Sequence, residues 1–291
     1  MDERQEVEQT HFSWRWLLGL VTACGLMFGF LAWLQLPMEA TVSLVLLVVL
    51  PIGLMLWYRR YAAASLYGLF WLALILLLPM VSWSHESARR VQCSNNLKQL
   101  TLALHAYHDV HGSFPPAYVA DAEGRPMHSW RVLILPFIER KDMYDVYRFD
   151  EPWDGPNNSK LAKIAVDLFQ CPSEAPSYNT NYVAIVGPGT AWPGATSMKL
   201  GDITDGWTDT LLLVEVAESG IHWLEPRDLH VGQMAPTINA KKGQGISSPH
   251  SGGANVSMAD GSVRFLSDET RPDLLRKLLS PYGGEEIVEE Y

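Results

Sequence analysis

The chain has 291 residues, of which 48% are hydrophobic and 19% are charged, and its formal net charge is −10. About nine of these net negative charges follow Ser84, where 18 Lys and Arg stand against 27 Asp and Glu. An acidic domain of this kind is poorly suited to nucleic acid, because contacts to phosphate need Lys and Arg. Nucleic acid is therefore not an expected partner.

Three apolar runs precede the acidic part of the chain and are predicted to be transmembrane helices. They cover residues 14–36, 40–58 and 62–83. Each run has about 20 residues, the length that a helix needs to cross the hydrocarbon core of a bilayer. The short loop between the second and third runs carries Arg59 and Arg60, which the positive-inside rule places in the cytoplasm.

These runs imply a multi-pass protein of the cytoplasmic membrane that contacts membrane lipid through its three spans. The expected parts are a cytoplasmic N-terminus (1–13), the membrane region (14–83), an extracytoplasmic domain (84–284) and an acidic tail (285–291).

The third run is predicted to continue as a long amphipathic helix over residues 87–111. Its apolar residues recur at helical spacing on one face, namely Val91, Leu97, Leu100, Leu104 and Tyr107. Gly112 can end this helix in a left-handed conformation, and the prolines at 115 and 116 prevent its continuation.

The rest of the domain alternates short helical and β-type segments. A second helical stretch is expected over residues 130–147, interrupted at Pro136, and a last short helix over 271–279. Strands are expected at 181–187, 210–217, 255–259 and 262–266. The last two flank Asp260–Gly261, which predicts a hairpin with a type I′ turn. The sequence thus predicts an α+β fold in which the long helix packs on an antiparallel sheet.

Several segments in a fixed order carry a family resemblance. They include SARRVQCSNNLKQLTLAL from Ser87, TNYVAIVGPGTAW from Thr180, ITDGWTDTLLLVEV from Ile203 and HSGGANVSMADGSVRFLSDE from His250. The chain resembles a large bacterial family of prepilin-like proteins of unknown function that carry a His-x9-Asp-Gly motif. The motif residues here are His250, Asp260 and Gly261. The resemblance implies a fold similar to type IV pilins or pseudopilins, and no established activity.

The chain departs from this family at the prepilin signature, which has a glycine at the cleavage point and a glutamate five residues in. The corresponding segment is residues 57–62, which reads WYRRYA and has neither residue. We therefore expect that prepilin peptidase does not process the chain.

Three groups of residues are candidates for chemistry. His250 and Asp260 could form a metal site or an acid–base pair, although an Asp-Gly hairpin turn with a hydrogen-bonded histidine is the simpler interpretation. Asp202, Asp205 and Asp209 could hold Ca²⁺, or could serve as turn residues. Cys93 and Cys171 could form a disulfide in an oxidising compartment.

The sequence contains no recognised nucleophile, zinc-protease or phosphate-binding motif. It therefore favours a structural or interaction protein with no catalytic activity and no cofactor, whose partner would be an envelope or secretion-assembly protein. A ligand-binding or sensory domain is the first alternative. A metal-dependent enzyme that uses His250 with Asp260, or the three aspartates, is the second.

Overall fold

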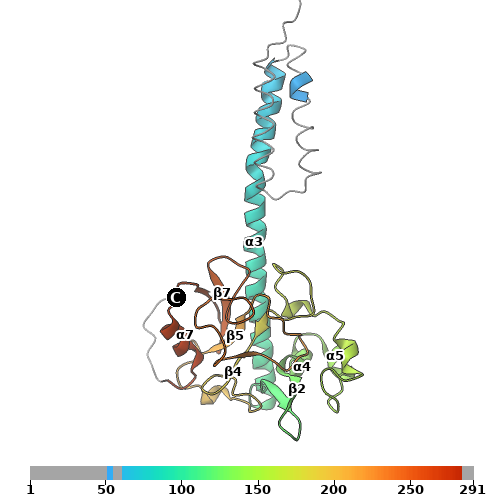
Figure 1. Cartoon of the computed structure of the whole chain (residues 1–291), viewed down its shortest axis with the longest axis vertical. Helices are drawn as coiled ribbons and strands as arrows, with labels where there is room; N and C mark the ends of the chain where they lie inside the picture. Colours follow the sequence, from blue (N-terminus) through green and yellow to red (C-terminus); the bar gives the residue numbers. More distant parts are fainter. Residues whose placement is uncertain (1–50, 55–60, 284–291) are drawn as a thin grey trace, which may run out of the picture. The chain divides into compact units, whose positions relative to one another are not determined.

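The computed structural model describes residues 51–54 and 61–283 (Figure 1). The chain divides into two compact units, and the boundary between them falls between Trp83 and Ser84. Helix α3 (Tyr61–His111) contributes its first residues to the first unit and the remainder to the second. The candidate functional site lies entirely within the second unit, to which the following description applies.

The prediction of three transmembrane helices is corrected by the structure. Among residues 51–54 and 61–283, no helix is long and apolar enough to cross a membrane. The third predicted run forms part of α3, which does not end at Trp83 but continues into the polar segment SHESARR. The localisation as a multi-pass membrane protein is corrected with it.

Two other predictions concern residues that the structure does not describe. The first predicted run, 14–36, and nearly all of the second, 40–58, lie outside the described residues. The same holds for most of the segment 57–62, on which the prediction about peptidase processing rests.

The second unit is α+β, and its main sheet is antiparallel, as predicted. The strands of this sheet follow the order β3 (Tyr182–Val183), β5 (Leu211–Glu215), β7 (Gly253–Met258) and β8 (Val263–Ser267). Two further pairs are antiparallel β1 (Tyr118–Ala120) with β2 (Pro126–Ser129), and parallel β4 (Ile185–Val186) with β6 (Leu229–His230).

Short helices connect the strands. The α-helices are α4 (Trp130–Leu133), α5 (Lys141–Val146), α6 (Asn158–Leu161) and α7 (Pro272–Leu279). The 3-10 helices are η1 (Leu135–Phe137), η2 (Asp167–Phe169) and η3 (Leu200–Asp202). The interrupted helical stretch after Trp130 and the last helix, with Pro272 in its first turn, therefore occur where the sequence predicts them.

The end of α3 follows from its glycine. Gly112 adopts a φ of +77°, and its amide donates a hydrogen bond of 2.7 Å to the carbonyl oxygen of His108. A residue with a side chain would be strained in this left-handed conformation, whereas glycine adopts it freely. The predicted helix end is confirmed.

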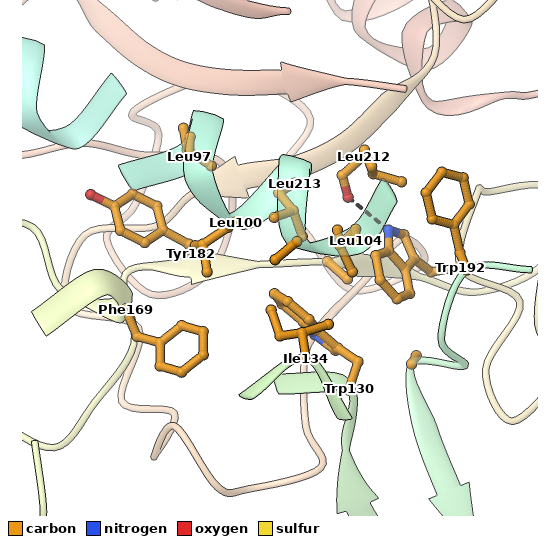
Figure 2. Packing of buried hydrophobic residues seen from close by; sticks show 14 of the residues in the cluster. Leu97, Leu100, Leu104, Trp130, Ile134, Phe169, Tyr182, Trp192, Leu212 and Leu213 are labelled. Carbon is orange, nitrogen blue, oxygen red and sulfur yellow. Dashed lines mark hydrogen bonds between the residues drawn. The ribbon is translucent and has the colours of Figure 1, made fainter. Parts of the chain in front are cut away.

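Strands β3, β5 and β7 of the main sheet are buried, because α3 packs on one face of the sheet and α7 on the other. Leu97, Leu100 and Leu104 of α3 share one core cluster with Tyr182 and Leu213 (Figure 2). The next residues along the same strands, Val183 and Val214, share a second cluster with four leucines of α7. Since side chains alternate across a strand, this burial explains why the run TLLLVEVA is apolar nearly throughout.

The hairpin between β7 and β8 forms at Asp260–Gly261, but its turn differs from the predicted one. A type I′ turn needs positive φ at both central residues, and here Gly261 has a φ of +86° whereas Asp260 does not have a positive φ. The Gly261 amide donates to the Met258 carbonyl at 3.0 Å, and the Met258 amide donates to Ser262 at 2.9 Å. These bonds describe a type I turn that ends in a glycine bulge.

Gly253, at the start of β7, is expected to tolerate no side chain. A Cβ there would overlap the carbonyl oxygen of Leu266 and lie 2.8 Å from Cε1 of Phe265. We expect Gly253→Ala to lower the free energy of unfolding by about 3 kcal/mol, the upper range for overpacking. Urea denaturation measures this loss. The matched control is Gly252→Ala, where no atom lies within 4 Å and only backbone strain at φ +86° costs about 1 kcal/mol. Equal losses would contradict the steric argument.

Candidate functional site

Four residues that are distant in sequence bring metal-ligating atoms together inside the second unit. They are Cys93 of α3, Cys171 after η2, Glu215 of β5 and His250 before β7. The two sulfurs, a carboxylate oxygen and a ring nitrogen all lie within 4.8 Å of one another, and no residue of the four is more than 3% exposed. We call this group the Cys–His–Glu cluster.

The two cysteines of the cluster are joined by a disulfide in this structure. Cys93 lies on the buried face of α3, one helical turn before Leu97. Cys171 is held in place because its amide donates to Oδ1 of Asn181 at 2.8 Å, and the Asn181 amide in turn bonds the Phe169 carbonyl. The Cα atoms of the two cysteines are 5.5 Å apart. The disulfide thus attaches the long helix to the segment that precedes the sheet.

Glu215 ends β5 with its carboxylate inside the protein. One oxygen, Oε2, accepts hydrogen bonds from the backbone amide and the side-chain amide of Asn255, at 3.1 and 3.0 Å. The other oxygen, Oε1, is buried and accepts no hydrogen bond from any residue that the structure describes. Burial raises the pKa of Glu215, while the Asn255 hydrogen bonds and the nearby His250 act in the opposite direction.

The His250 ring lies between two carboxylates and the disulfide. Nδ1 is 2.6 Å from Oε1 of Glu86, whereas Nε2 is 3.5 Å from Sγ of Cys171 and 3.7 Å from Oε1 of Glu215. Because an ionised Glu86 can only accept, Nδ1 carries the hydrogen. In the neutral ring the lone pair is then on Nε2, which faces the interior of the cluster.

Glu86 belongs to the same helix as Cys93, seven residues earlier, so the two share a face of α3. Burial would raise the pKa of Glu86, but hydrogen bonds from Arg89 and His250 outweigh that effect and lower it. The Arg89 bond is 2.7 Å from Nη2. Glu86 is therefore an ionised carboxylate that orients the imidazole from the partly exposed side of the cluster.

The possible pairing of His250 with Asp260, the less favoured interpretation of the motif, does not appear as a contact. His250 contacts the cluster, Glu86 and Ser248, whereas Asp260 lies in the β7–β8 turn, where its Oδ1 accepts from the Ser262 amide at 2.8 Å. Gly261 provides the positive φ of the same turn. The histidine thus belongs to the candidate site, while the Asp-Gly pair shapes the hairpin.

The three aspartates that were weak candidates for a calcium site take separate partners. Asp202 caps η3 by accepting from the Lys199 amide at 3.0 Å, and Asp205 accepts from the Gly283 amide. Asp209 forms a 3.7 Å ion pair with Arg264. They are not part of any convergent ligand group within residues 61–283.

Sequence reasoning missed both carboxylates of the site. Glu215 carries a usable signal, because it is the single charged residue in the apolar run TLLLVEVA, and a charge in a buried strand needs a partner. The sequence signal for Glu86 is weaker, namely its spacing of two helical turns from Cys93. Neither signal identifies His250 as the common partner.

Residues 84–273 match a protein family, SBP_bac_10, which is described as a protein of unknown function (DUF1559). No curated protein and no solved structure matches the chain. The matched range contains every member of the Cys–His–Glu cluster as well as Glu86. Since the match covers more than half of the chain, the protein belongs to the DUF1559 family.

Proposed function

We propose that this protein is a structural or interaction protein without catalytic activity, and that α3 is its assembly element, as in the pilin-like proteins that it resembles. The observation that carries the proposal is a set of large apolar side chains exposed on the first part of α3. Their exposed fractions are 70% for Leu66, 62% for Leu69, 60% for Phe70 and 53% for Leu72. Exposed apolar side chains gathered in this way mark a surface that binds another molecule.

The spacing of these residues indicates how the surface is covered. Leu66, Leu69 and Phe70 stand three and four positions apart and share one face, while Leu72 lies on a different side of the helix. A helix that is apolar on several sides is buried in its working state. The partner that offers a matching apolar helix is a second copy of the chain, so we propose that α3 segments pack against one another.

The second unit supports a non-catalytic role. It fixes the last part of α3 through the buried residues Leu97, Leu100 and Leu104 and through the disulfide at Cys93. His250 and Asp260, the acid–base pair that the sequence offered as an alternative, take separate partners. A unit that holds one helix through several independent attachments is suited to presenting that helix for assembly.

The test is site-specific photo-crosslinking of the full chain in cells that produce it. A benzophenone amino acid at Leu69 is expected to yield an adduct with the mass of two chains. The control position is Val146 of α5, which is 60% exposed but belongs to the second unit, and should yield no such adduct. Adducts at Leu69 with a different, reproducible protein would replace self-assembly by an envelope or secretion-assembly partner. The absence of any protein adduct at Leu69 would contradict the proposal.

A further inference from the structure

We propose that the Cys–His–Glu cluster is a metal site in its reduced form, and that it exchanges the disulfide for a thiophilic divalent cation such as Zn²⁺. The four ligands are Sγ of Cys93, Sγ of Cys171, Nε2 of His250 and Oε1 of Glu215. Each belongs to a different segment of the second unit, so a bound ion would join α3 to the sheet as the disulfide does.

The spacing of the donor atoms suits a tetrahedral ion. Zinc binds thiolate, imidazole and carboxylate at roughly 2.0–2.3 Å, which places neighbouring ligands about 3.3–3.8 Å apart. The separations from Nε2 of His250 are already 3.5 Å to Sγ of Cys171 and 3.7 Å to Oε1 of Glu215. The main rearrangement is therefore separation of the two sulfurs, by on the order of 2 Å, once their bond is broken.

Glu215 supplies an independent observation that points to a ligand. Its Oε1 is buried without a hydrogen bond from the described residues, although Asn255 fixes the other oxygen of the same carboxylate. A buried acceptor left unsatisfied costs about 1–3 kcal/mol, and more when it is charged. A cation between Oε1 and the sulfurs would satisfy this oxygen without moving Asn255.

The arrangement behind His250 is one that metal-binding histidines commonly have. A ligating imidazole usually donates its other N–H to a carboxylate, which fixes the ring and raises its basicity. Glu86 occupies that position, 2.6 Å from Nδ1, and Arg89 holds Glu86 in turn. The helix that supplies Cys93 as a ligand thus also orients the histidine ligand.

Exchange between the disulfide and the metal-bound state is a two-electron reaction. A dithiol reductant donates two electrons and two protons, the Cys93–Cys171 bond breaks, two thiols form, and the reductant leaves as its own disulfide. The metal ion then forms two S–metal bonds and releases the two thiol protons. A two-electron oxidant, such as an oxidised dithiol, re-forms the S–S bond and frees the ion.

A route to the sulfurs exists on the surface of the second unit. A depression of about 580 Å³ lies beside α3 and is lined by Gln92, Gln170 and Cys171, among others. Cys171 itself is only 2% exposed, so a reductant would need a local opening of this surface to reach it. Glu86, whose side chain is 41% exposed, lies at the partly open side of His250.

The test uses the purified full chain, reduced with a phosphine and handled without oxygen, and titrated with Co²⁺ as a spectroscopic probe. We expect one ion per reduced chain, with the thiolate charge-transfer bands and visible bands of tetrahedral cobalt, and displacement of the probe by Zn²⁺. The oxidised chain should show neither band. A reduced, folded chain that binds no Co²⁺, or binds it without thiolate bands, would overturn the proposal.

Three variants test the roles assigned to a ligand, to an orienting group and to a control residue. Glu215→Gln removes the carboxylate charge while its carbonyl can still accept from Asn255, and should weaken Co²⁺ binding at least 100-fold. Glu86→Gln should weaken it about 10–100-fold, as expected for a group that orients a ligand. Asp260→Asn is the matched control and should bind as the wild type does. Unchanged affinity in Glu215→Gln would overturn the ligand assignment.

The proposal remains testable if reduction unfolds the chain. In that case, recovery of the native circular dichroism on addition of Zn²⁺ supports it, because metal binding then supplies folding free energy. Continued unfolding at saturating Zn²⁺ overturns it.

Discussion

Replacement of Asp228 by alanine is expected to lower the free energy of unfolding by about 3–5 kcal/mol, the cost of leaving a buried charge without its partner. The partner is Arg131 at the start of α4, whose side chain is completely buried, as Asp228 nearly is. Nη2 of Arg131 lies 2.5 Å from Oδ1 of Asp228. Without the carboxylate, the buried guanidinium would lose the counter-ion that it contacts.

Asp228 also accepts other hydrogen bonds that the substitution would remove. The Ala184 amide donates to it at 2.9 Å and the Trp130 indole at 3.2 Å, so the carboxylate joins α4 to the chain between β3 and β4. Burial raises the pKa of Asp228, and the Arg131 charge acts against this rise. The large loss on truncation therefore reflects the cost of isolating a charge more than a net gain from the pair.

Urea denaturation measures the loss, and an exposed pair provides the control. Lys141 and Asp145 form an exposed ion pair of 2.5 Å, and Asp145→Ala should cost less than about 1 kcal/mol. The double variant Arg131→Met with Asp228→Leu should cost less than the sum of its single variants, because it leaves no isolated charge. Equal costs for Asp228→Ala and Asp145→Ala would contradict the argument.

The elements that could be predicted from the sequence are those determined by residues close to one another in the chain. The helix up to His111 ends because of Gly112, and the β7–β8 hairpin forms at an Asp-Gly turn between two β-type runs. Even there, the choice between turn types depended on the φ of Asp260, which the letters Asp-Gly alone do not determine.

The elements that could not be predicted depend on contacts between distant residues. Strands β4 and β6 have two residues each and exist because Ile185 and Leu229, 44 positions apart, pair in parallel. The Arg131–Asp228 pair spans 97 positions. The transmembrane prediction rested on the length and apolar composition of runs of residues, whereas no helix within residues 51–54 and 61–283 is long and apolar enough to cross a membrane.

The candidate site shows the same division. His250 and the two cysteines could be named from the sequence, but not what surrounds them. The motif offered Asp260, ten positions after His250, as its possible acidic partner, whereas the fold supplies Glu86 from the helix and Glu215 from the sheet. Spacing along the chain is a poor guide here because the segment between His250 and Asp260 is largely strand β7, which carries its ends apart.

Removal of the Cys93–Cys171 disulfide is the second change with a large expected effect. The variant Cys93→Ala with Cys171→Ala should lose about 4 kcal/mol of unfolding free energy, because the bond closes a loop of 78 residues and restricts the unfolded chain accordingly. Urea denaturation under oxidising conditions, with wild type and variant side by side, measures this difference.

A reductant provides the internal control for this prediction. Without metal, reduction should lower the stability of the wild type towards that of the double variant and leave the variant unchanged, since only the wild type has the bond to lose. Zn²⁺ at 100 times its dissociation constant should then restore about 2.7 kcal/mol to the reduced wild type alone. A wild type whose stability does not respond to reduction would show that the disulfide does not hold α3 to the sheet. A variant that gains as much from Zn²⁺ as the wild type would place the metal elsewhere than on the two sulfurs.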